Sequence, residues 1–242
     1  MVQTILILAA NPKDTLRVRL EEEVREIDAG LKRARQRDQF VLEQKWAVRP
    51  RDIQRAMLDI NPQIVHFSGH GAGDEGLVFE DETGQAKLVN SEALARLFNL
   101  FANNVECIVL NGCYSEVQAD AISQHIKYVI GMRQAIGDKA AIEFAVGFYD
   151  ALGAGRSIEF AYNSGCVAIR LAGISEELTP TLKKKPNIGD TILRHNSRYN
   201  RTVESSPFSS SFFRVPGILT SIITIIVTGV LISFFTSHMN SK

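Results

Sequence analysis

Cysteine is scarce in this sequence, and Cys107, Cys113 and Cys166 form no Cys-x-x-Cys pair. An odd number of cysteines without such a pair argues against a disulfide framework and against a structural zinc site. A reducing compartment fits this cysteine usage. An excess of one charge is also missing, since 27 basic residues balance 27 acidic residues. The composition therefore gives no general electrostatic reason to expect nucleic acid as a partner.

The N-terminal apolar run ILILAA lacks the basic flank of a signal peptide, because no lysine or arginine precedes it. The run is also short, so we expect a first buried strand. No internal repeat is visible. Residues 1–172 instead alternate between short apolar runs and segments with helical periodicity. This alternation predicts an α/β domain with a mainly parallel sheet and helices on both faces.

The expected elements follow from the periodicity and from the turn residues. Strands are predicted at 4–10, 40–48 (near a sheet edge), 64–69, 106–111 and 128–132, with a hairpin over 76–89 that turns at Thr83-Gly84. Helices are predicted from Asp14 to about 31, over 50–59, from Ser91 to about 102, and over 117–124, 138–152 and 157–171. In the first helix, Leu16, Leu20, Val24, Ile27 and Leu31 form the apolar face and Arg and Glu the other. Ser91 is the expected cap of the third helix.

The C-terminal part of the chain has a different composition. Residues 173–214 are polar and rich in Ser, Pro and Lys, which is typical of a flexible linker. We expect Lys183, Lys184 and Lys185 to be exposed candidates for self-cleavage. Residues 215–237 carry no charge, and as a helix they would span about 34 Å at 1.5 Å per residue. That length covers a bilayer core, so we expect a transmembrane helix rather than a buried core helix.

The basic residues lie mainly before this predicted helix. Arg198, Arg201 and Arg214 precede it, and only His238 and Lys242 follow, in a short tail of residues 238–242. The positive-inside rule then keeps the N-terminal domain in the cytoplasm. The sequence predicts a single-pass, tail-anchored membrane protein.

Two apolar runs end in residues that carry chemistry. IVHFSGHG ends in His70 between two glycines, and CIVLNGCYS ends in Asn111-Gly112-Cys113. Ligands of open parallel sheets bind at the carboxyl ends of the strands, so His70 and Cys113 would face one crevice. A cysteine thiolate is a nucleophile, and an imidazole can take its proton. Gly71 and Gly112 permit close backbone approach, and neighbouring backbone N–H groups could hold an oxyanion.

Other candidate residues have simpler interpretations. Cys107 and Cys166 are expected to be packing residues, and His66, which lies mid-strand, a core histidine with satisfied hydrogen bonds. An acidic segment (Asp74, Glu75, Glu80, Asp81 and Glu82) could bind calcium but lacks EF-hand spacing, so we expect a solvated hairpin and no metal site.

The combination of motifs resembles a known family. Cys113 follows His70 by 43 residues, near the separation of about 50 in caspases. The stretches ILILAANP, RLEEEVREI, PQIVHFSGHG and VLNGCYS, followed by the segment from VIGM to IEFAY, resemble the CHAT branch of caspase-like cysteine peptidases over residues 1–172.

The resemblance implies specific roles. His70 matches the catalytic histidine, Cys113 the nucleophile, and Gly71 the oxyanion-hole position. The family cleaves peptide bonds through a thioester and needs no cofactor. Asp138 matches a recurrent acid, which could accept a basic P1 side chain or cap the next helix; we favour the cap. Asn111 and Asp138 are the candidate substrate-pocket residues.

The resulting hypothesis is a membrane-anchored CHAT-type cysteine endopeptidase acting on protein substrates, in bacterial defence or stress signalling by resemblance alone. Since the chain shows no sensor module, we expect a regulatory partner or homo-oligomer assembly on the membrane. Two alternatives are a non-catalytic scaffold and a membrane-perturbing effector triggered through the CHAT domain. The second would use helix packing at small or hydroxylated residues of the predicted span: Gly217, Thr220, Ser221, Thr224, Thr228 and Gly229.

Overall fold

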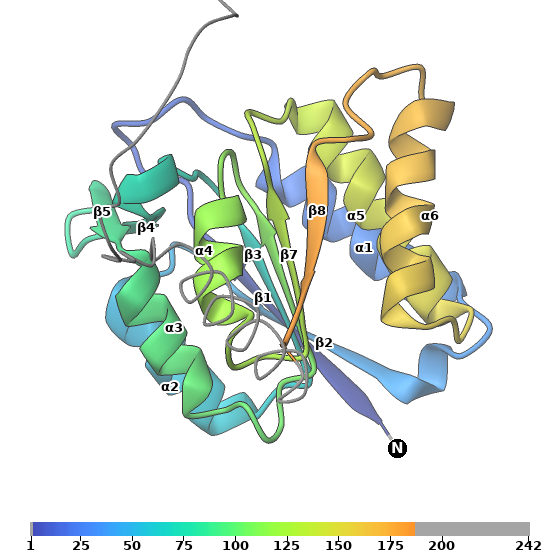
Figure 1. Cartoon of the computed structure of the whole chain (residues 1–242), viewed down its shortest axis with the longest axis horizontal. Helices are drawn as coiled ribbons and strands as arrows, with labels where there is room; N and C mark the ends of the chain where they lie inside the picture. Colours follow the sequence, from blue (N-terminus) through green and yellow to red (C-terminus); the bar gives the residue numbers. More distant parts are fainter. Residues whose placement is uncertain (1, 187–242) are drawn as a thin grey trace, which may run out of the picture. The chain divides into compact units, whose positions relative to one another are not determined.

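The computed structural model describes residues 2–186, which form a sheet between two layers of helices (Figure 1). The six strands stand in the order β2 (Phe40–Lys45), β1 (Gln3–Ala9), β3 (Ile64–Ser68), β6 (Cys107–Asn111), β7 (Tyr128–Met132) and β8 (Pro180–Lys184). The first five are parallel, and β8 is antiparallel to β7. The predicted mainly parallel sheet is confirmed. So is the edge position of β2, whose residues are largely exposed.

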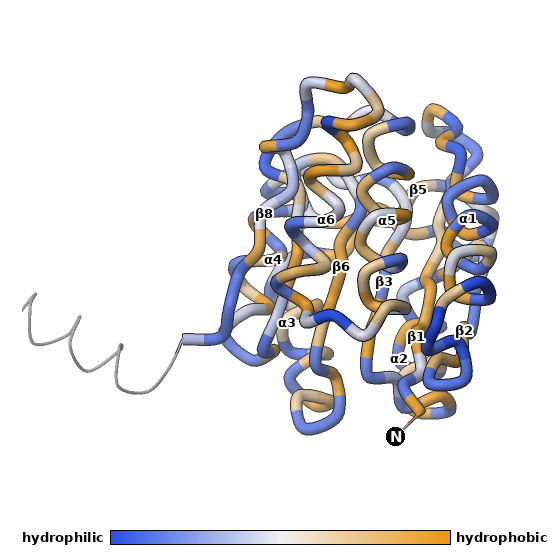
Figure 2. The backbone as a smooth tube through the Cα atoms, turned by 90° about the vertical axis from the view of Figure 1, so that its right-hand side faces the viewer, coloured by the Kyte–Doolittle hydropathy of each residue, from blue (hydrophilic) through white to orange (hydrophobic). Residues whose placement is uncertain are grey.

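Helices cover both faces of the sheet, as predicted. One face carries α1 (Leu20–Arg33), α5 (Asp138–Gly153) and α6 (Ile158–Leu171), and the other carries α2 (Pro50–Ile60), α3 (Ser91–Asn99) and α4 (Glu116–Ile122). Successive strand residues point to opposite faces. Ile64 of β3 therefore packs against the first set of helices, and Val65 against the second. The strands are apolar and lie between the helices, whose outer surfaces are polar (Figure 2).

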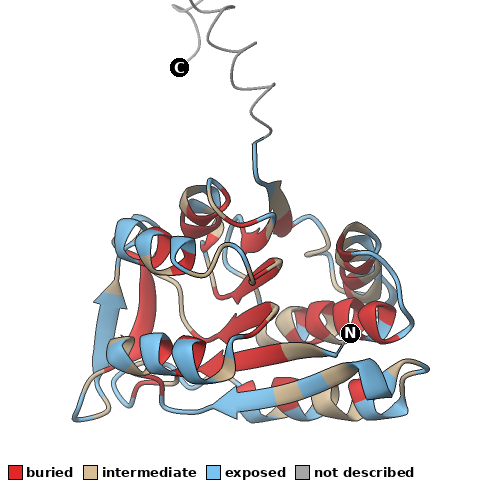
Figure 3. Cartoon of the chain, turned by 90° about the horizontal axis from the view of Figure 1, so that it is seen from below, coloured by how far each residue is buried: buried red, intermediate tan, exposed pale blue. Residues whose placement is uncertain are grey.

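Burial follows the same layering. The central strands are buried, whereas the outward faces of the helices are exposed (Figure 3). The central strands do not alternate between apolar and polar residues because helices cover both faces of the sheet. The sheet brings the carboxyl ends of β3 and β6 side by side, because these two strands are hydrogen-bonded neighbours.

A small hairpin of β4 (Leu77–Glu80) and β5 (Ala86–Val89) connects β3 to α3. Gly84 has φ +80° in its turn, which confirms the predicted Thr83-Gly84 turn. Asp81 and Glu82 have protein partners there. The Asp81 carboxylate accepts hydrogen bonds from the N–H groups of Thr83 and Gln85, and Glu82 pairs with Arg49 and Arg51. The short 3₁₀ helices are η1 (Arg37–Gln39) and η2 (Gly73–Glu75).

The predicted start of the first helix and the predicted cap of the third helix were wrong. The first helix begins at Leu20 rather than at Asp14, and Leu16 is 88% exposed instead of facing the core. The segment before α1 is shaped by Asn11, whose side chain bonds to the main chain of Val18. The cap of α3 is Asn90 and not Ser91, because the Asn90 side chain accepts a hydrogen bond from the Ala93 N–H.

The prediction that the whole of 173–214 is a linker was wrong for its first part, because β8 belongs to the sheet. Five residue pairs join β8 to β7, and Thr181 Oγ1 donates to the Gly131 carbonyl at 3.2 Å. Lys183 Nζ lies 2.8 Å from both the Glu116 and Asp120 carboxylates of α4. Lys183 and Lys184 are therefore strand residues and not linker residues.

The remaining predictions for the C-terminal part concern residues outside the described range. These are the rest of the linker, the transmembrane helix at 215–237 and the tail at 238–242. Within residues 2–186, no helix combines the length and the apolar character that crossing a bilayer requires.

Candidate active site

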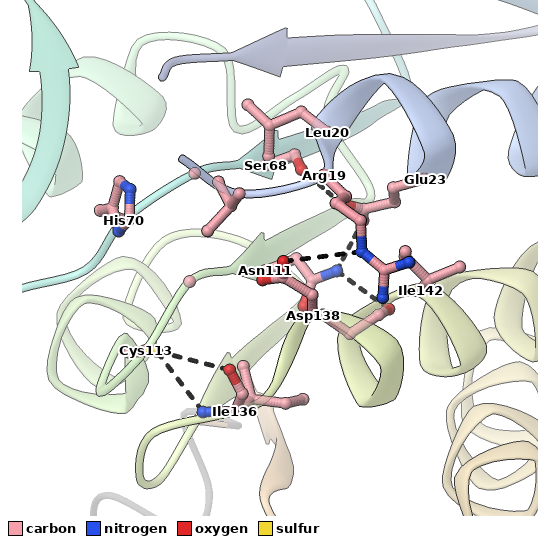
Figure 4. Close-up of a pocket in the computed structure, with 14 residues that line it drawn as sticks. Arg19, Leu20, Glu23, Ser68, His70, Asn111, Cys113, Ile136, Asp138 and Ile142 are labelled. Carbon is pink, nitrogen blue, oxygen red and sulfur yellow. Dashed lines mark hydrogen bonds and ion pairs between the residues drawn. The ribbon is translucent and has the colours of Figure 1, made fainter. Parts of the chain in front are cut away.

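The site lies where β3 and β6 end next to each other. Ser68 and Asn111 are the last paired residues of the two strands, and the Gly69 N–H donates to the Asn111 carbonyl at 3.4 Å. His70 lies two residues beyond Ser68, and Cys113 two residues beyond Asn111. Both line one pocket (Figure 4), which confirms that the two strand ends face a common crevice.

The two strand ends approach each other so closely that only glycine fits between them. A Cβ on Gly71 would lie 2.0 Å from the Cys113 carbonyl oxygen. A Cβ on Gly112 would lie 2.9 Å from the Gly69 carbonyl oxygen. Both contacts are with backbone atoms, which cannot move aside as a side chain could. The predicted close approach at Gly71 and Gly112 is therefore present.

The Cys113 side chain is half-buried, and its sulfur faces the loop that follows β7. The Ile136 N–H points to Cys113 Sγ at 3.4 Å, and the Ile136 carbonyl oxygen lies 3.7 Å from it. The next residue, Tyr114, has φ +55°, an unusual conformation for a residue with a side chain. Such a conformation next to a reactive residue is often found at functional sites.

The main chain of His70 is held by a hydrogen bond, whereas one nitrogen of its imidazole ring has no partner in the part of the chain that the structure describes. The His70 carbonyl accepts a hydrogen bond from the Val78 N–H of β4 at 2.9 Å. His70 Nε2 is buried and has no hydrogen-bond partner among residues 2–186. An unpartnered imidazole nitrogen in a pocket that also contains a cysteine is available for proton transfer.

The far part of the pocket is acidic and contains Glu23, a residue that the sequence analysis missed. In Figure 4, Glu23, Asn111 and Asp138 lie apart from His70 and Cys113. Glu23 is 3% exposed, and Asn111 Nδ2 donates to its carboxylate at 2.5 Å. Asn111 Oδ1 is buried without a partner in the described part of the chain. A polar substrate side chain could donate to this oxygen.

The predicted helix cap at Asp138 was wrong. Gly137 occupies the cap position of α5, and Asp138 is the first helical residue, with no side-chain capping bond. Its carboxylate lines the pocket and lies 3.8 Å from Arg19 Nε. An acid in the first turn still favours the helix electrostatically, but the side chain is directed to the pocket.

The other two cysteines are packing residues, as predicted. Cys107 is buried within β6, and burial raises the pKa of its thiol far above the usual range. Cys166 lies in α6, and burial raises its pKa as well. His66 is a fully buried core histidine whose two ring nitrogens are both hydrogen-bonded. Across residues 2–186, no group of three or more His, Cys, Asp or Glu side chains is arranged to hold a metal ion.

The sequence is similar to those of known proteins. The CHAT domain model matches residues 2–165. A Roc-COR-CHAT protease from an unknown prokaryotic organism is 28% identical over 145 residues, which are 57% of this chain and 14% of that protein. A probable protease from Gillisia limnaea is 22% identical over 143 residues, 58% of this chain and 25% of that protein. The chain thus spans a quarter or less of the length of these relatives.

A solved structure shares the fold. The secreted C11 cysteine protease from Bacteroides thetaiotaomicron, solved with an irreversible peptide inhibitor, superposes with a TM-score of 0.55. The two are 14% identical, and the alignment covers 85% of this chain and 71% of that one. At this identity the similarity supports the caspase-like fold alone. Because the family model covers more than half of the sequence, this chain belongs to the CHAT-domain family.

Proposed function

We propose that the chain is a cysteine endopeptidase in which Cys113 is the nucleophile and His70 the general base. The observation that carries this proposal is the juxtaposition of the two side chains in one pocket, with His70 Nε2 unpartnered. Membership in the CHAT family supports it, as do two relatives that are named as proteases.

The reaction follows from the positions of these groups. His70 takes the proton from Cys113 Sγ, and the thiolate attacks the carbonyl carbon of the scissile peptide bond. The resulting oxyanion needs hydrogen-bond donors. The backbone N–H groups of Gly71 and Cys113 donate to no other group within residues 2–186, so both are free to do so.

The tetrahedral intermediate then collapses. The C–N bond breaks, His70 returns the proton to the leaving amine, and the acyl group stays on Cys113 as a thioester. A water molecule, deprotonated by His70, attacks the thioester. The carboxylic acid product leaves, and the Cys113 thiol is restored.

The acidic part of the pocket supports a preference for a basic P1 side chain. Since Asp138 does not cap α5, the alternative role as a partner of a basic P1 residue remains for it. The unpartnered Asn111 Oδ1 adds an acceptor to the same pocket. Arg19 lies beside Asp138 and would have to give up this contact when a basic side chain enters.

Proteomic comparison of new N-termini tests both proposals. Cells that express the wild-type chain are compared with cells that express Cys113→Ala at an equal level. We expect N-termini that appear only with the wild type and that follow Lys or Arg. An identical set of N-termini in both cells would contradict the peptidase function, and wild-type cleavage after other residues would contradict the P1 preference alone.

The location and biological role rest on the sequence. The uncharged, apolar segment 215–237 and the arginines before it support a C-terminal membrane anchor with the peptidase domain in the cytoplasm. We further propose that a regulatory protein or assembly into a homo-oligomer on the membrane controls the peptidase. A role in bacterial defence or stress signalling is proposed from the family resemblance.

A further inference from the structure

Five buried polar side chains form a cluster beneath the pocket, which we call the Glu23 cluster. It consists of Glu23 on α1, His66 and Ser68 on β3, Asn111 on β6 and Tyr149 on α5. Each is less than 5% exposed. Burying a carboxyl group costs free energy unless its oxygens are hydrogen-bonded, so the partners of Glu23 matter for the stability of this part of the fold.

The Glu23 carboxylate receives three hydrogen bonds from two neighbouring strands. His66 Nε2 lies 2.9 Å from Oε1, and Asn111 Nδ2 donates to the same oxygen at 2.5 Å. Ser68 Oγ donates to Oε2. On the other side of the imidazole, Tyr149 Oη lies 3.0 Å from His66 Nδ1.

The hydrogen-bond directions in this cluster follow from chemistry. Asn111 Nδ2 faces two acceptors, the Glu23 carboxylate and the Ala141 carbonyl, which defines the orientation of the amide. Burial raises the pKa of the Tyr149 hydroxyl well above its usual value, so it stays protonated and can donate to His66 Nδ1. His66 Nε2 then carries its proton and donates to Glu23.

The cluster connects the two catalytic strand ends. Ser68 and Asn111 are paired across β3 and β6, and each precedes a reactive residue by two positions: Ser68 precedes His70, and Asn111 precedes Cys113. Both point to the face that α1 covers, because they continue the alternation of Ile64-His66-Ser68 and Cys107-Val109-Asn111. Figure 4 shows the Glu23 side chain reaching from α1 toward Ser68 and Asn111.

The geometry points to Glu23 as a positioning residue, whose carboxylate sets the ends of β3 and β6, and through them His70 and Cys113, relative to each other. This inference rests on the proposed function of those two residues. Beyond Ser68 and Asn111 the strands continue through Gly69 and Gly112, which have no side chains to pack. The hydrogen bonding between the two strands ends there with one bond of 3.4 Å, from the Gly69 N–H to the Asn111 carbonyl. A displacement of about 1 Å between reacting groups can lower a rate about 100-fold, so a constraint at this point has a large effect.

The test is Glu23→Gln in the full chain, which keeps the size of the side chain but places an amide group against the Asn111 amide. We expect kcat for a peptide substrate to fall at least roughly tenfold with KM changed less than about threefold, because the reacting groups and not the binding surface are displaced. We also expect slower alkylation of Cys113 by iodoacetamide, a small reagent that needs no substrate pocket.

Two control variants separate positioning from general destabilisation. Glu26→Gln makes the same chemical change on an exposed part of α1, where Glu26 pairs with Arg25, and should leave both rates unchanged. Ile27→Ala removes a buried side chain of α1 that faces the core and should lower Tm without lowering kcat of the folded protein. An unchanged kcat and alkylation rate in folded Glu23→Gln would overturn the inference, and so would an equal loss in Ile27→Ala.

If Glu23→Gln does not fold, Ser68→Ala provides the test, because it removes only the bond to Oε2. We expect a smaller fall of kcat and of the Cys113 alkylation rate, and unchanged values would overturn the inference. The alkylation rate also separates this inference from the proposed function. If the wild-type chain cleaves no peptide, the peptidase function is contradicted. If Cys113 is nevertheless alkylated more slowly in Glu23→Gln than in the wild type, the positioning role is still supported.

Discussion

At the level of single residues, the three cysteines differ in what surrounds each sulfur. Burial raises the pKa of Cys107 and Cys166, so both remain thiols at neutral pH, whereas Cys113 lines the pocket. The thiolate is the reactive form. Iodoacetamide at pH 7 should therefore alkylate Cys113 at least roughly tenfold faster than the other two. Mass spectrometry of the digested protein measures the three rates, and equal labelling would contradict the assignment of the nucleophile.

The two histidines of IVHFSGHG should respond differently to substitution. His70 has a free ring nitrogen at the pocket, so His70→Ala should lower kcat by about 10²–10⁴-fold with little change in Tm. His66→Ala should lower the free energy of unfolding by about 3–5 kcal/mol, because it removes one of the three hydrogen bonds to the buried Glu23 carboxylate and leaves a cavity in the core. Kinetics together with thermal unfolding distinguish the two. A stable, inactive His66→Ala beside an active His70→Ala would show that the base is His66.

At the level of elements, the strands and helices around the site were predictable from the sequence. Strands that helices cover on both faces are apolar throughout, whereas helices with one buried face have apolar residues at every third or fourth position. Each pattern therefore identifies its own type of element in the sequence. The adjacency of His70 and Cys113 could be inferred as well, because strand ends of a parallel sheet meet at one edge.

Features that depend on tertiary contacts were not predicted. β8 is a short, Lys-rich strand after a polar segment, and its strand structure depends on pairing with β7 and on the contacts of Lys183 with α4. Glu23 was assigned to the polar face of its helix, although it stands three residues after Leu20 and four before Ile27, on the apolar face. A charged residue at such a position was the available signal of a buried polar partner.

The pairing of β8 leads to a prediction about chain length. A chain that ends at Ala172 lacks β8, while one that ends at Thr191 keeps it. Because five residue pairs join β8 to β7, at about 1 kcal/mol net per hydrogen bond, the shorter chain should unfold roughly 10 °C lower or aggregate. Thermal unfolding of both chains measures this difference. Equal melting temperatures would mean that β8 contributes nothing to the stability of the domain.

At the level of the whole molecule, the membrane anchor predicted at 215–237 can be separated from the peptidase domain. We expect the full chain to sediment with membranes and to resist extraction at high pH, and the chain that ends at Thr191 to remain in the supernatant with Cys113 still reactive. Fractionation of cells that express each form is the measurement. Full-length protein in the supernatant would contradict the anchor, and a loss of folding in the shorter chain would place the C-terminal segment within the fold.

The central claim is that the paired ends of β3 and β6 form a peptidase site. The most direct test measures the cleavage of a defined peptide pool by the purified full chain. The reaction is also quenched with acid, and the mass of the intact enzyme is then measured by mass spectrometry. The account predicts new peptide N-termini and an acyl adduct on Cys113 for the wild type. It predicts neither for Cys113→Ala and at most trace product for His70→Ala, with all three proteins folded. Cleavage by Cys113→Ala at the wild-type rate would contradict the account.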